Sequence, residues 1–137
     1  MVDERRLVRL LQRITNELGH LEGLAAGDRV ALRADQERLA GLKYWFITTL
    51  EGVINVAQHV CASEGWGPPK DNGDAVRLLG QHGVIDAELA ARVAGAVGFR
   101  NLLVHQYVDV DDDRVVAFLD EIGDVDAYVG GVTAWIG

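Results

Sequence analysis

The sequence predicts an all-α fold, an up-and-down four-helix bundle with one additional short helix. Leucine and isoleucine recur at three- and four-residue steps through the first segment, which is the spacing of one apolar helix face. No run alternates apolar and polar residues as a half-buried strand does, and the only two prolines are adjacent. We therefore expect residues 1–137 to form a single helical domain, large enough for one core.

Helix boundaries follow from the apolar spacing and from the residues that begin and end helices. Four main helices and one short helix are expected, over residues 3–26, 35–64, 86–107 and 114–128 and, for the short one, 74–81. Asp74 should cap the short helix, and the Gly130-Gly131 pair should end the last one. Residues 28–34 fit either a connector or a helical turn. Residues 132–137 should fray unless Trp135 docks on the bundle.

Composition and the placement of polar residues indicate a cytosolic protein that does not enter the membrane. The best apolar stretch is interrupted by Glu51, Asn55 and Gln58, so no segment has the roughly 20 apolar residues of a membrane span. The stretch Met1–Arg6 is charged and lacks the apolar core of a signal peptide. The single cysteine, Cys61, rules out an intrachain disulfide and fits a small core residue.

The net charge of −8 is unusual for a protein that binds nucleic acid, because such proteins normally carry a basic surface. Eight acidic residues fall between Asp109 and Asp126, where Arg114 is the only opposing charge. Four arginines cluster in the first helix, at Arg5, Arg6, Arg9 and Arg13. The charge is thus polarised along the chain. A local basic surface is compatible with this distribution, whereas broad binding to duplex nucleic acid is not expected.

Phe99–Tyr107 brings polar side chains into a run that otherwise fits the core. On a helix, Asn101 and His105 share a face, so the asparagine amide can hydrogen-bond one imidazole nitrogen and leave the other free. Arg100 lies about 140° of rotation from His105, too far for a fixed pair within one ideal helix. Two chains crossing this helix about a two-fold axis would bring both arginines and both histidines together. Taken alone, the pair also fits a dipole partner and a surface arginine.

Ala91, Gly95 and Gly98 form a stripe of small residues on the same predicted helix. Glycine inside a helix costs about 1 kcal/mol relative to alanine, so a compensating close approach of another backbone is expected. That backbone belongs either to the long second helix or to the same helix of a second protomer. The pattern does not distinguish the two.

A polar stripe runs along the long second helix at four- and three-residue steps, through Tyr44, Thr48, Glu51, Asn55 and Gln58. It fits either an ordinary solvated surface or the lining of a cleft beside Arg100 and His105. Glu51 is the residue of most interest, because a carboxylate there would orient the arginine or the histidine.

Arg100 and His105 suit cleavage of a phosphodiester without a metal, which needs a base for the attacking hydroxyl, an acid for the departing oxygen and positive charge on the phosphate. Imidazole fills either proton-transfer role near neutral pH, and guanidinium binds phosphate oxygens in a bidentate fork. One histidine and one arginine per chain fall short, but a homodimer supplies two of each. No metal or cofactor is expected, because the histidines lie in separate segments without metal-ligand spacing: His20, His59, His82 and His105.

The spacing Arg100-x4-His105-x-Tyr107 resembles the R-x4-H-x-Y signature of the HepT-like branch of HEPN-domain ribonuclease toxins. The resemblance runs from about Tyr44 to about Asp120 and implies the same helical fold. It implies an endoribonuclease toxin with Arg100 and His105 as catalytic residues. It also implies a cognate antitoxin, a minimal nucleotidyltransferase that can transfer AMP to the motif tyrosine, here Tyr107.

Two other functions remain compatible with the sequence. In one, the chain is a non-catalytic helical module that partners a nucleotidyltransferase and binds a nucleotide or a partner peptide, which suits the acidic C-terminal third. In the other, it is a dimeric bundle whose R-x4-H motif is inert. Growth arrest on expression that disappears in Arg100→Ala or His105→Ala would distinguish the ribonuclease from both.

Overall fold

The computed structural model describes residues 2–137, and within these residues all regular secondary structure is helical. In chain order the elements are α1 (Glu4–Ala26), α2 (Arg29–Ala34), α3 (Gln36–Glu64), α4 (Asn72–Gln81), α5 (Ala87–His105), α6 (Asp112–Ala117), the 3-10 turn η1 (Phe118–Glu121) and α7 (Gly123–Ile136). The all-α prediction is confirmed. The segment after the first helix, left open between a connector and a helical turn, is the short helix α2.

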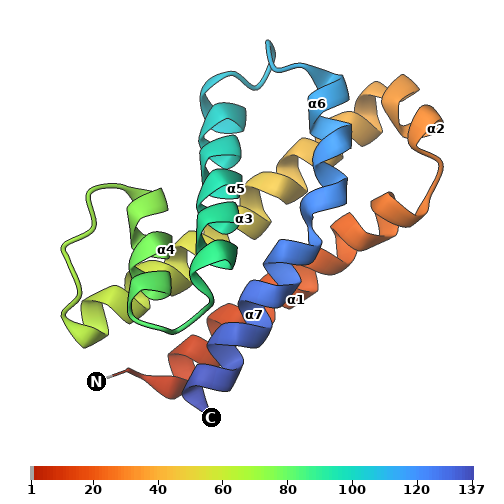
Figure 1. Cartoon of the computed structure of the whole chain (residues 1–137). Helices are drawn as coiled ribbons and strands as arrows, with labels where there is room; N and C mark the ends of the chain where they lie inside the picture. The colour runs from red at the N-terminus through yellow and green to blue at the C-terminus, as the bar shows by residue number, and fades with distance from the viewer. Residues whose placement is uncertain (1) are drawn as a thin grey trace.

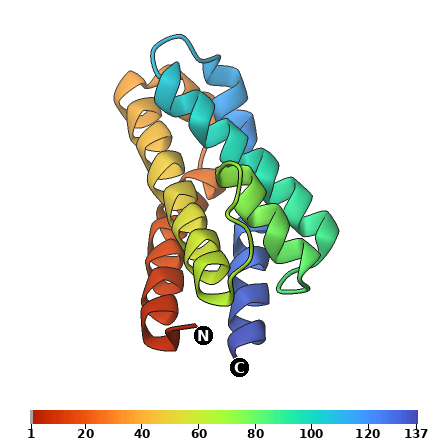
Figure 2. The same ribbon diagram turned by 90° about the vertical axis from the view of Figure 1, so that its left-hand side faces the viewer.

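Four long helices, α1, α3, α5 and α7, form the bundle. Each packs on the next in chain order, and α7 returns to α1. Figures 1 and 2 show these helices running alternately up and down, with the N- and C-termini at the same end. The short helix α4 packs against both α3 and α5 (Figure 2). Helix α4 lies along the first half of α5. The C-terminal half of α5 extends past the N-terminal end of α4, so α4 does not cover it.

The apolar spacing of α1 and α3 correctly predicts which residues of these helices are buried. Five residues of the α1 stripe are buried, at Leu7, Leu11, Ile14, Leu18 and Leu21, and Leu10 is partly buried. In α3 the buried residues surround more of the helix, because α3 lies between α1 on one side and α4 and α5 on the other. Asp3 and Asp35 cap these two helices by accepting hydrogen bonds from backbone N–H groups of their first turns.

The start of α4 differs from the prediction. Asp71, three residues before the expected cap, is the N-cap, and its Oδ1 accepts from the Asp74 backbone N–H at 2.7 Å. Asp74 lies in the first turn instead, where its carboxylate accepts from the Lys70 backbone N–H at 2.8 Å. Both aspartates satisfy backbone donors at this end, so sequence alone favours either one as the cap.

The last helix was predicted wrongly in its continuity and at its C-terminal end. The expected continuous helix over 114–128 is divided into α6, η1 and α7, and α7 continues through Gly130 and Gly131 to Ile136. A Cβ at Gly131 would lie 2.8 Å from Ile85 Cγ2, so this glycine allows α7 to approach the segment before α5. Trp135, which was expected to prevent fraying if it docked, is partly buried, with its ring 6.2 Å from that of Trp66.

The end of the motif helix places His105 and Tyr107 in different elements. The motif helix α5 ends at His105, with Gln106 as its C-cap, so Tyr107 lies in the turn that follows and not on the helix.

Among the described residues, no helix combines the length and the apolar character that crossing a bilayer requires.

Candidate active site

Arg100 projects from α5 with most of its side chain buried, and 20% of that side chain is exposed. Its Nη1 donates to Asn101 Oδ1 at 3.1 Å, and its Nη2 lies 3.8 Å from Glu51 Oε2 on α3. Its Nε is buried and has no hydrogen-bond partner. The guanidinium is thus oriented by two neighbours while part of its donor capacity is unused, which suits a group that receives a phosphate.

The Arg100 head group contacts the side chain of its neighbour Asn101. Asn101 and His105 lie about 40° apart around the helix, whereas the Arg100 Cα lies about 140° from His105. The structure gives no contact between the guanidinium and His105. The expected hydrogen bond from Asn101 to His105 is not formed in this structure.

His105 is the last residue of α5, exposed, and without a hydrogen-bond or ion-pair partner among the described residues. Its ring is therefore accessible to a substrate or a second chain. His105 can take up or release a proton without first breaking a contact in the protein.

The polar stripe of α3 lies on the surface, and one of its residues contacts the motif. Tyr44 and Glu51 are exposed, and Gln58 donates to Asn72 Oδ1 at 2.8 Å at the beginning of α4. Of the two roles considered for Glu51, the structure brings its carboxylate to Arg100, and the structure gives it no contact with His105. The stripe is thus mostly a solvated face, with Glu51 as the point where it meets the motif.

Tyr107 lies against α3 just beyond the end of α5. Its hydroxyl donates to the Ala40 carbonyl oxygen at 3.3 Å, and 38% of the residue is exposed. Its own carbonyl oxygen accepts from Lys43 Nζ at 3.1 Å. Lys43 was not singled out from the sequence. The available signal was a charged residue between Leu42 and Phe46, on the side of the helix that faces the core.

The small-residue stripe of α5 is open to solvent. Ala91, Gly95 and Gly98 are exposed, and a Cβ built at either glycine meets nothing within 4 Å. Of the two partners that the sequence allowed for this stripe, the long helix α3 is therefore not the one that covers it. Leu102 and His105 fall on the same face by helical rotation, so this open face runs along α5 to the motif histidine.

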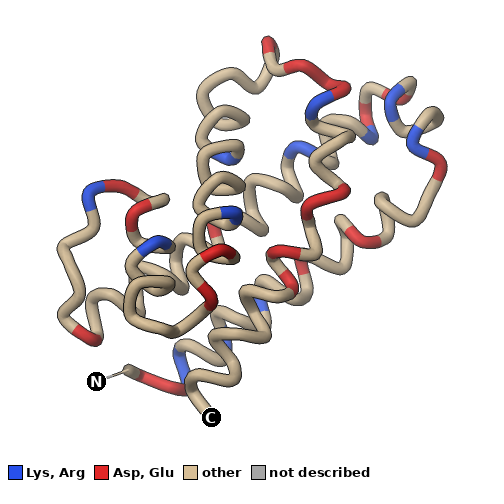
Figure 3. Tube along the Cα trace, viewed as in Figure 1, with Lys and Arg blue, Asp and Glu red and all other residues tan. Residues whose placement is uncertain are grey.

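Half of the eight acidic residues between Asp109 and Asp126 form ion pairs with cations other than Arg100, one of them being the contact of Asp112 with Lys43. Asp120 contacts Arg29, Asp113 contacts Arg33 and Asp124 contacts Arg92, at distances of 2.6, 2.6 and 3.1 Å. Figures 1 and 3 show acidic positions around α6 and basic positions on α2 in neighbouring parts of the bundle. These ion pairs offset part of the negative charge of the C-terminal third.

The described residues form neither a metal site nor a reactive cysteine. No group of three or more His, Cys, Asp or Glu side chains in the described part of the chain is placed to hold a metal ion. Cys61 is buried and its Sγ contacts the Ala75 carbonyl oxygen at 3.5 Å. Burial, and secondarily the charge of Asp74, raises the pKa of the Cys61 thiol, so the thiolate is disfavoured at neutral pH.

Comparison with known proteins agrees with this arrangement of motif and fold. The tRNA nuclease HepT of Aphanizomenon flos-aquae is 30% identical over 118 residues, which are 84% of this chain and 76% of that protein. A relative from Archaeoglobus fulgidus is 31% identical over 84 residues, 61% of this chain and 63% of its own length, so the match spans less than two thirds of that protein.

Solved structures share the fold. The tri-AMPylated HEPN toxin of Shewanella oneidensis, in complex with MNT antitoxin, has a TM-score of 0.85 at 22% identity and covers 98% of this chain and 99% of that one. Residues 8–129 match the family model described as Ribonuclease HepT-like. Most of the sequence lies within that match, and this chain belongs to the ribonuclease HepT-like family.

Proposed function

We propose that the protein is a metal-independent endoribonuclease that acts as a homodimer, the toxin of a toxin–antitoxin pair in the cytoplasm. The observation that carries this proposal is the state of the two motif side chains at the end of α5: His105 is exposed without a partner, and the Arg100 guanidinium is oriented by Asn101 and Glu51. Family membership supports the same activity, since the Aphanizomenon flos-aquae relative is a tRNA nuclease.

The proposed roles follow from the chemistry of the two side chains. A base removes the proton of the ribose 2′-hydroxyl, the 2′-oxygen attacks phosphorus, and an acid protonates the departing 5′-oxygen. His105 fills either proton-transfer role because imidazole titrates near neutral pH. Arg100 stabilises the negative charge on the phosphate oxygens. One His105 cannot be base and acid in the same step, so the proposal requires the His105 of a second chain.

The open face of α5 supports the homodimer. Gly95 and Gly98 carry no side chain that would keep another helix away, and nothing in the chain covers them. If two copies of this face cross about a two-fold axis close to their C-terminal ends, the two His105 residues are brought toward one another. In this arrangement Asn101 and Glu51 are positioning residues, because both contact Arg100 and hold its head group near the interface.

We further propose that a minimal nucleotidyltransferase neutralises the toxin by transferring AMP to the Tyr107 hydroxyl. The Shewanella oneidensis neighbour is a tri-AMPylated toxin in complex with MNT antitoxin, and its fold is shared by this chain. Tyr107 follows His105 by two residues and is partly exposed. A nucleotide there would add bulk and negative charge beside the catalytic residues and repel the RNA phosphates.

Expression of the wild-type chain beside Arg100→Ala and His105→Ala tests the ribonuclease proposal. Wild type should arrest growth and degrade RNA, in cells and as purified protein with a metal chelator present, whereas both variants should do neither. His105→Ala should leave the melting temperature nearly unchanged, since an exposed residue without partners contributes about 0.5 kcal/mol or less.

Arg77→Ala and His82→Ala are matched controls, since both residues are exposed and lie away from the motif. They should behave as wild type. A wild-type protein that binds the nucleotidyltransferase without cleaving RNA would overturn the proposal in favour of the non-catalytic binding module. Unfolding of His105→Ala would show that the residue is structural.

A further inference from the structure

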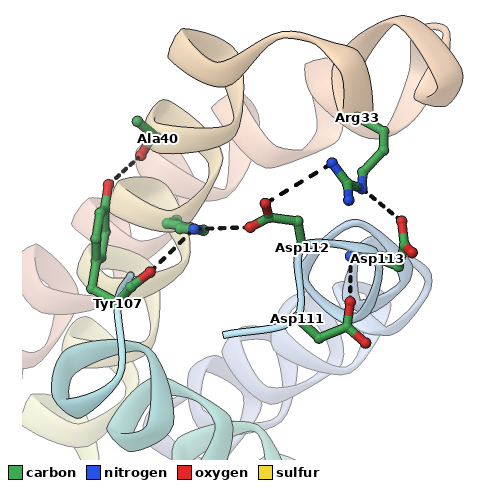
Figure 4. Close-up of polar contacts among 7 residues, drawn as sticks. Arg33, Ala40, Tyr107, Asp111, Asp112 and Asp113 are labelled. Atoms are coloured by element: carbon green, nitrogen blue, oxygen red, sulfur yellow. Dashed lines mark hydrogen bonds and ion pairs between the residues drawn. The ribbon is translucent and has the colours of Figure 1, made fainter. Parts of the chain in front are cut away.

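Lys43 is a buried lysine of α3 that contacts the segment following α5. Only 8% of the residue is exposed, and its Nζ lies 3.1 Å from the Tyr107 carbonyl oxygen and 2.9 Å from Asp112 Oδ1. The ammonium also lies 5.0 Å from the centroid of the Tyr107 ring. In Figure 4, Tyr107 and Asp112 lie on opposite sides of the ammonium group that both of them contact. One cation thus joins α3, the motif tyrosine and the beginning of α6.

The burial of this charge needs a reason, because removing an ammonium group from water is costly unless it is paired. Lys43 lies on the core-facing side of α3, next to Leu42, at a position where an apolar side chain would pack without that cost. Its partner Asp112 is held from the other side by Arg33, at 3.9 Å. The lysine is therefore fixed in place, and what it holds beyond the ion pair is the main chain of Tyr107.

The two ends of Tyr107 are held with unequal strength. Its carbonyl oxygen accepts from the charged, buried ammonium of Lys43, and charge-assisted hydrogen bonds are the stronger kind. Its hydroxyl makes a longer, neutral hydrogen bond of 3.3 Å to Ala40 on a part-exposed residue, where water competes. The hydroxyl can therefore leave α3 while the main chain of the tyrosine stays fixed.

We propose that Lys43 is a positioning residue for the modification of Tyr107, holding the main chain so that the released hydroxyl is presented to the nucleotidyltransferase. This inference rests on the proposed function, in which Tyr107 accepts AMP. Lys43 also offsets the charge of Asp112 beside the acceptor, which would otherwise repel an approaching triphosphate. It makes no contact with Arg100 or His105 in the structure, so RNA cleavage does not depend on it.

The group-transfer step is a substitution at phosphorus. The Tyr107 oxygen forms a bond to the α-phosphorus of ATP, and the bond from that phosphorus to pyrophosphate breaks. The hydroxyl proton passes to a base of the nucleotidyltransferase, and pyrophosphate leaves. The product is a phosphodiester that carries one negative charge. Lys43 touches neither the nucleotide nor the reacting oxygen, so it acts through the placement of Tyr107.

The test uses the full chain with its nucleotidyltransferase and ATP labelled at the α-phosphate. In Lys43→Met, kcat for AMP transfer should fall at least about tenfold, because a loosely held acceptor is rarely in line for attack. The KM for ATP should not change, since the partner binds the nucleotide. RNA cleavage by the unmodified variant should stay within about twofold of wild type, as the catalytic geometry on α5 is untouched.

Lys70→Met is the matched control, because Lys70 is the only other lysine and lies exposed in the loop before α4. It should be modified at the wild-type rate. Asp112→Asn, which keeps the shape but removes the ion pair, should show a smaller loss of kcat. If circular dichroism shows that Lys43→Met is unfolded, kcat for AMP transfer to Asp112→Asn tests the proposal instead.

Four results would overturn the inference. Modification of Lys43→Met and Asp112→Asn at the wild-type rate would show that the contact positions nothing. Equal loss of AMP transfer and RNA cleavage would show a general structural role. Label that persists in Tyr107→Phe, or a wild type that cleaves RNA but takes no AMP, would remove Tyr107 as the acceptor while leaving the ribonuclease proposal intact.

Discussion

Glu51 Oε2 of α3 lies 3.8 Å from Arg100 Nη2 of α5, a contact between two helices that the sequence separates by about fifty residues. The Glu51 carboxylate contacts Nη2 of the guanidinium, and the Asn101 side-chain oxygen accepts a hydrogen bond from Nη1. Because the Glu51 carboxylate is about half exposed and the two atoms are 3.8 Å apart, the contribution of the pair to stability is small, about 0–1 kcal/mol. Its consequence is orientation of the arginine that we assign to phosphate binding.

Glu51→Gln should therefore reduce RNA cleavage modestly and leave stability unchanged. Loss of an exposed ion pair worth up to about 1 kcal/mol corresponds to roughly a fivefold change in rate. Single-turnover cleavage of a labelled RNA measures the effect, and Glu37→Gln, exposed at the start of the same helix, is the control. Complete inactivation, as expected for Arg100→Ala, would mean that Glu51 itself takes part in the chemistry.

Gly95→Leu should dissociate the proposed homodimer. The leucine would project from the open face of α5 where close approach of a second helix is expected. The isolated chain should not suffer, since the site has nothing within 4 Å and leucine is the better helix former by about 1 kcal/mol. Light scattering measures the mass, with Gly23→Leu on the equally open face of α1 as control. A dimer that survives the change would place the interface elsewhere.

Gly130→Ala and Gly131→Ala should have opposite effects although they are neighbours in α7. Nothing lies within 4 Å of a Cβ at Gly130, so alanine should stabilise the helix by up to about 1 kcal/mol. A Cβ at Gly131 would come within 2.8 Å of Ile85 Cγ2, and crowding of this kind costs about 1–3 kcal/mol. Urea unfolding of the two variants checks the order. Equal effects would contradict the close packing of α7 on Ile85.

The protein should lose stability at alkaline pH through two buried groups. Burial raises the pKa of the Tyr128 hydroxyl above its ordinary 10.0, and burial raises the pKa of the Cys61 thiol above its ordinary 9.0. The unfolded chain therefore releases these protons first, and the native state falls in stability once the pH passes those ordinary values. Below pH 9 both groups are protonated in both states and have no effect. Each group adds a slope of about 1.4 kcal/mol per pH unit.

Tyr128→Phe isolates one of the two contributions. The variant loses the hydrogen bond of 3.0 Å to the Val53 carbonyl oxygen, which costs about 1 kcal/mol at neutral pH, but its stability should fall less steeply above pH 10. Urea unfolding between about pH 8 and pH 11 measures both effects. Tyr44→Phe, at an exposed tyrosine, should keep the wild-type slope. An unchanged slope in Tyr128→Phe would refute the assignment.

Much of the fold could be predicted from the sequence because helix formation and capping are local. The α1 stripe gave the buried face of the first helix, and Asp3 and Asp35 gave its start and that of α3. The failure at Gly130-Gly131 has a non-local cause. Glycine weakens a helix when it is exposed, but Gly131 is kept inside α7 by its contact with Ile85, about fifty residues earlier in the chain.

The candidate site divides in the same way. Arg100, Asn101, His105 and Tyr107 could be singled out from one short motif, because their spacing is a property of the chain itself. That Asn101 contacts Arg100 instead of His105, and that α5 ends before Tyr107, depends on neighbours that spacing does not report. Lys43 was missed because a lone lysine on a helix is usually solvated, and its burial is visible only once α5 and α6 are in place.

The sequence by itself determined the helices, their apolar faces and the residues available for chemistry, since periodicity and capping depend on residues within a turn or two of each other. Tertiary structure decided which faces meet. It brought Glu51 to Arg100, buried Lys43 beneath Tyr107 and left the Gly95 face of α5 uncovered. A period tells which side of a helix is apolar, but the partner of that side is set by packing of the whole chain.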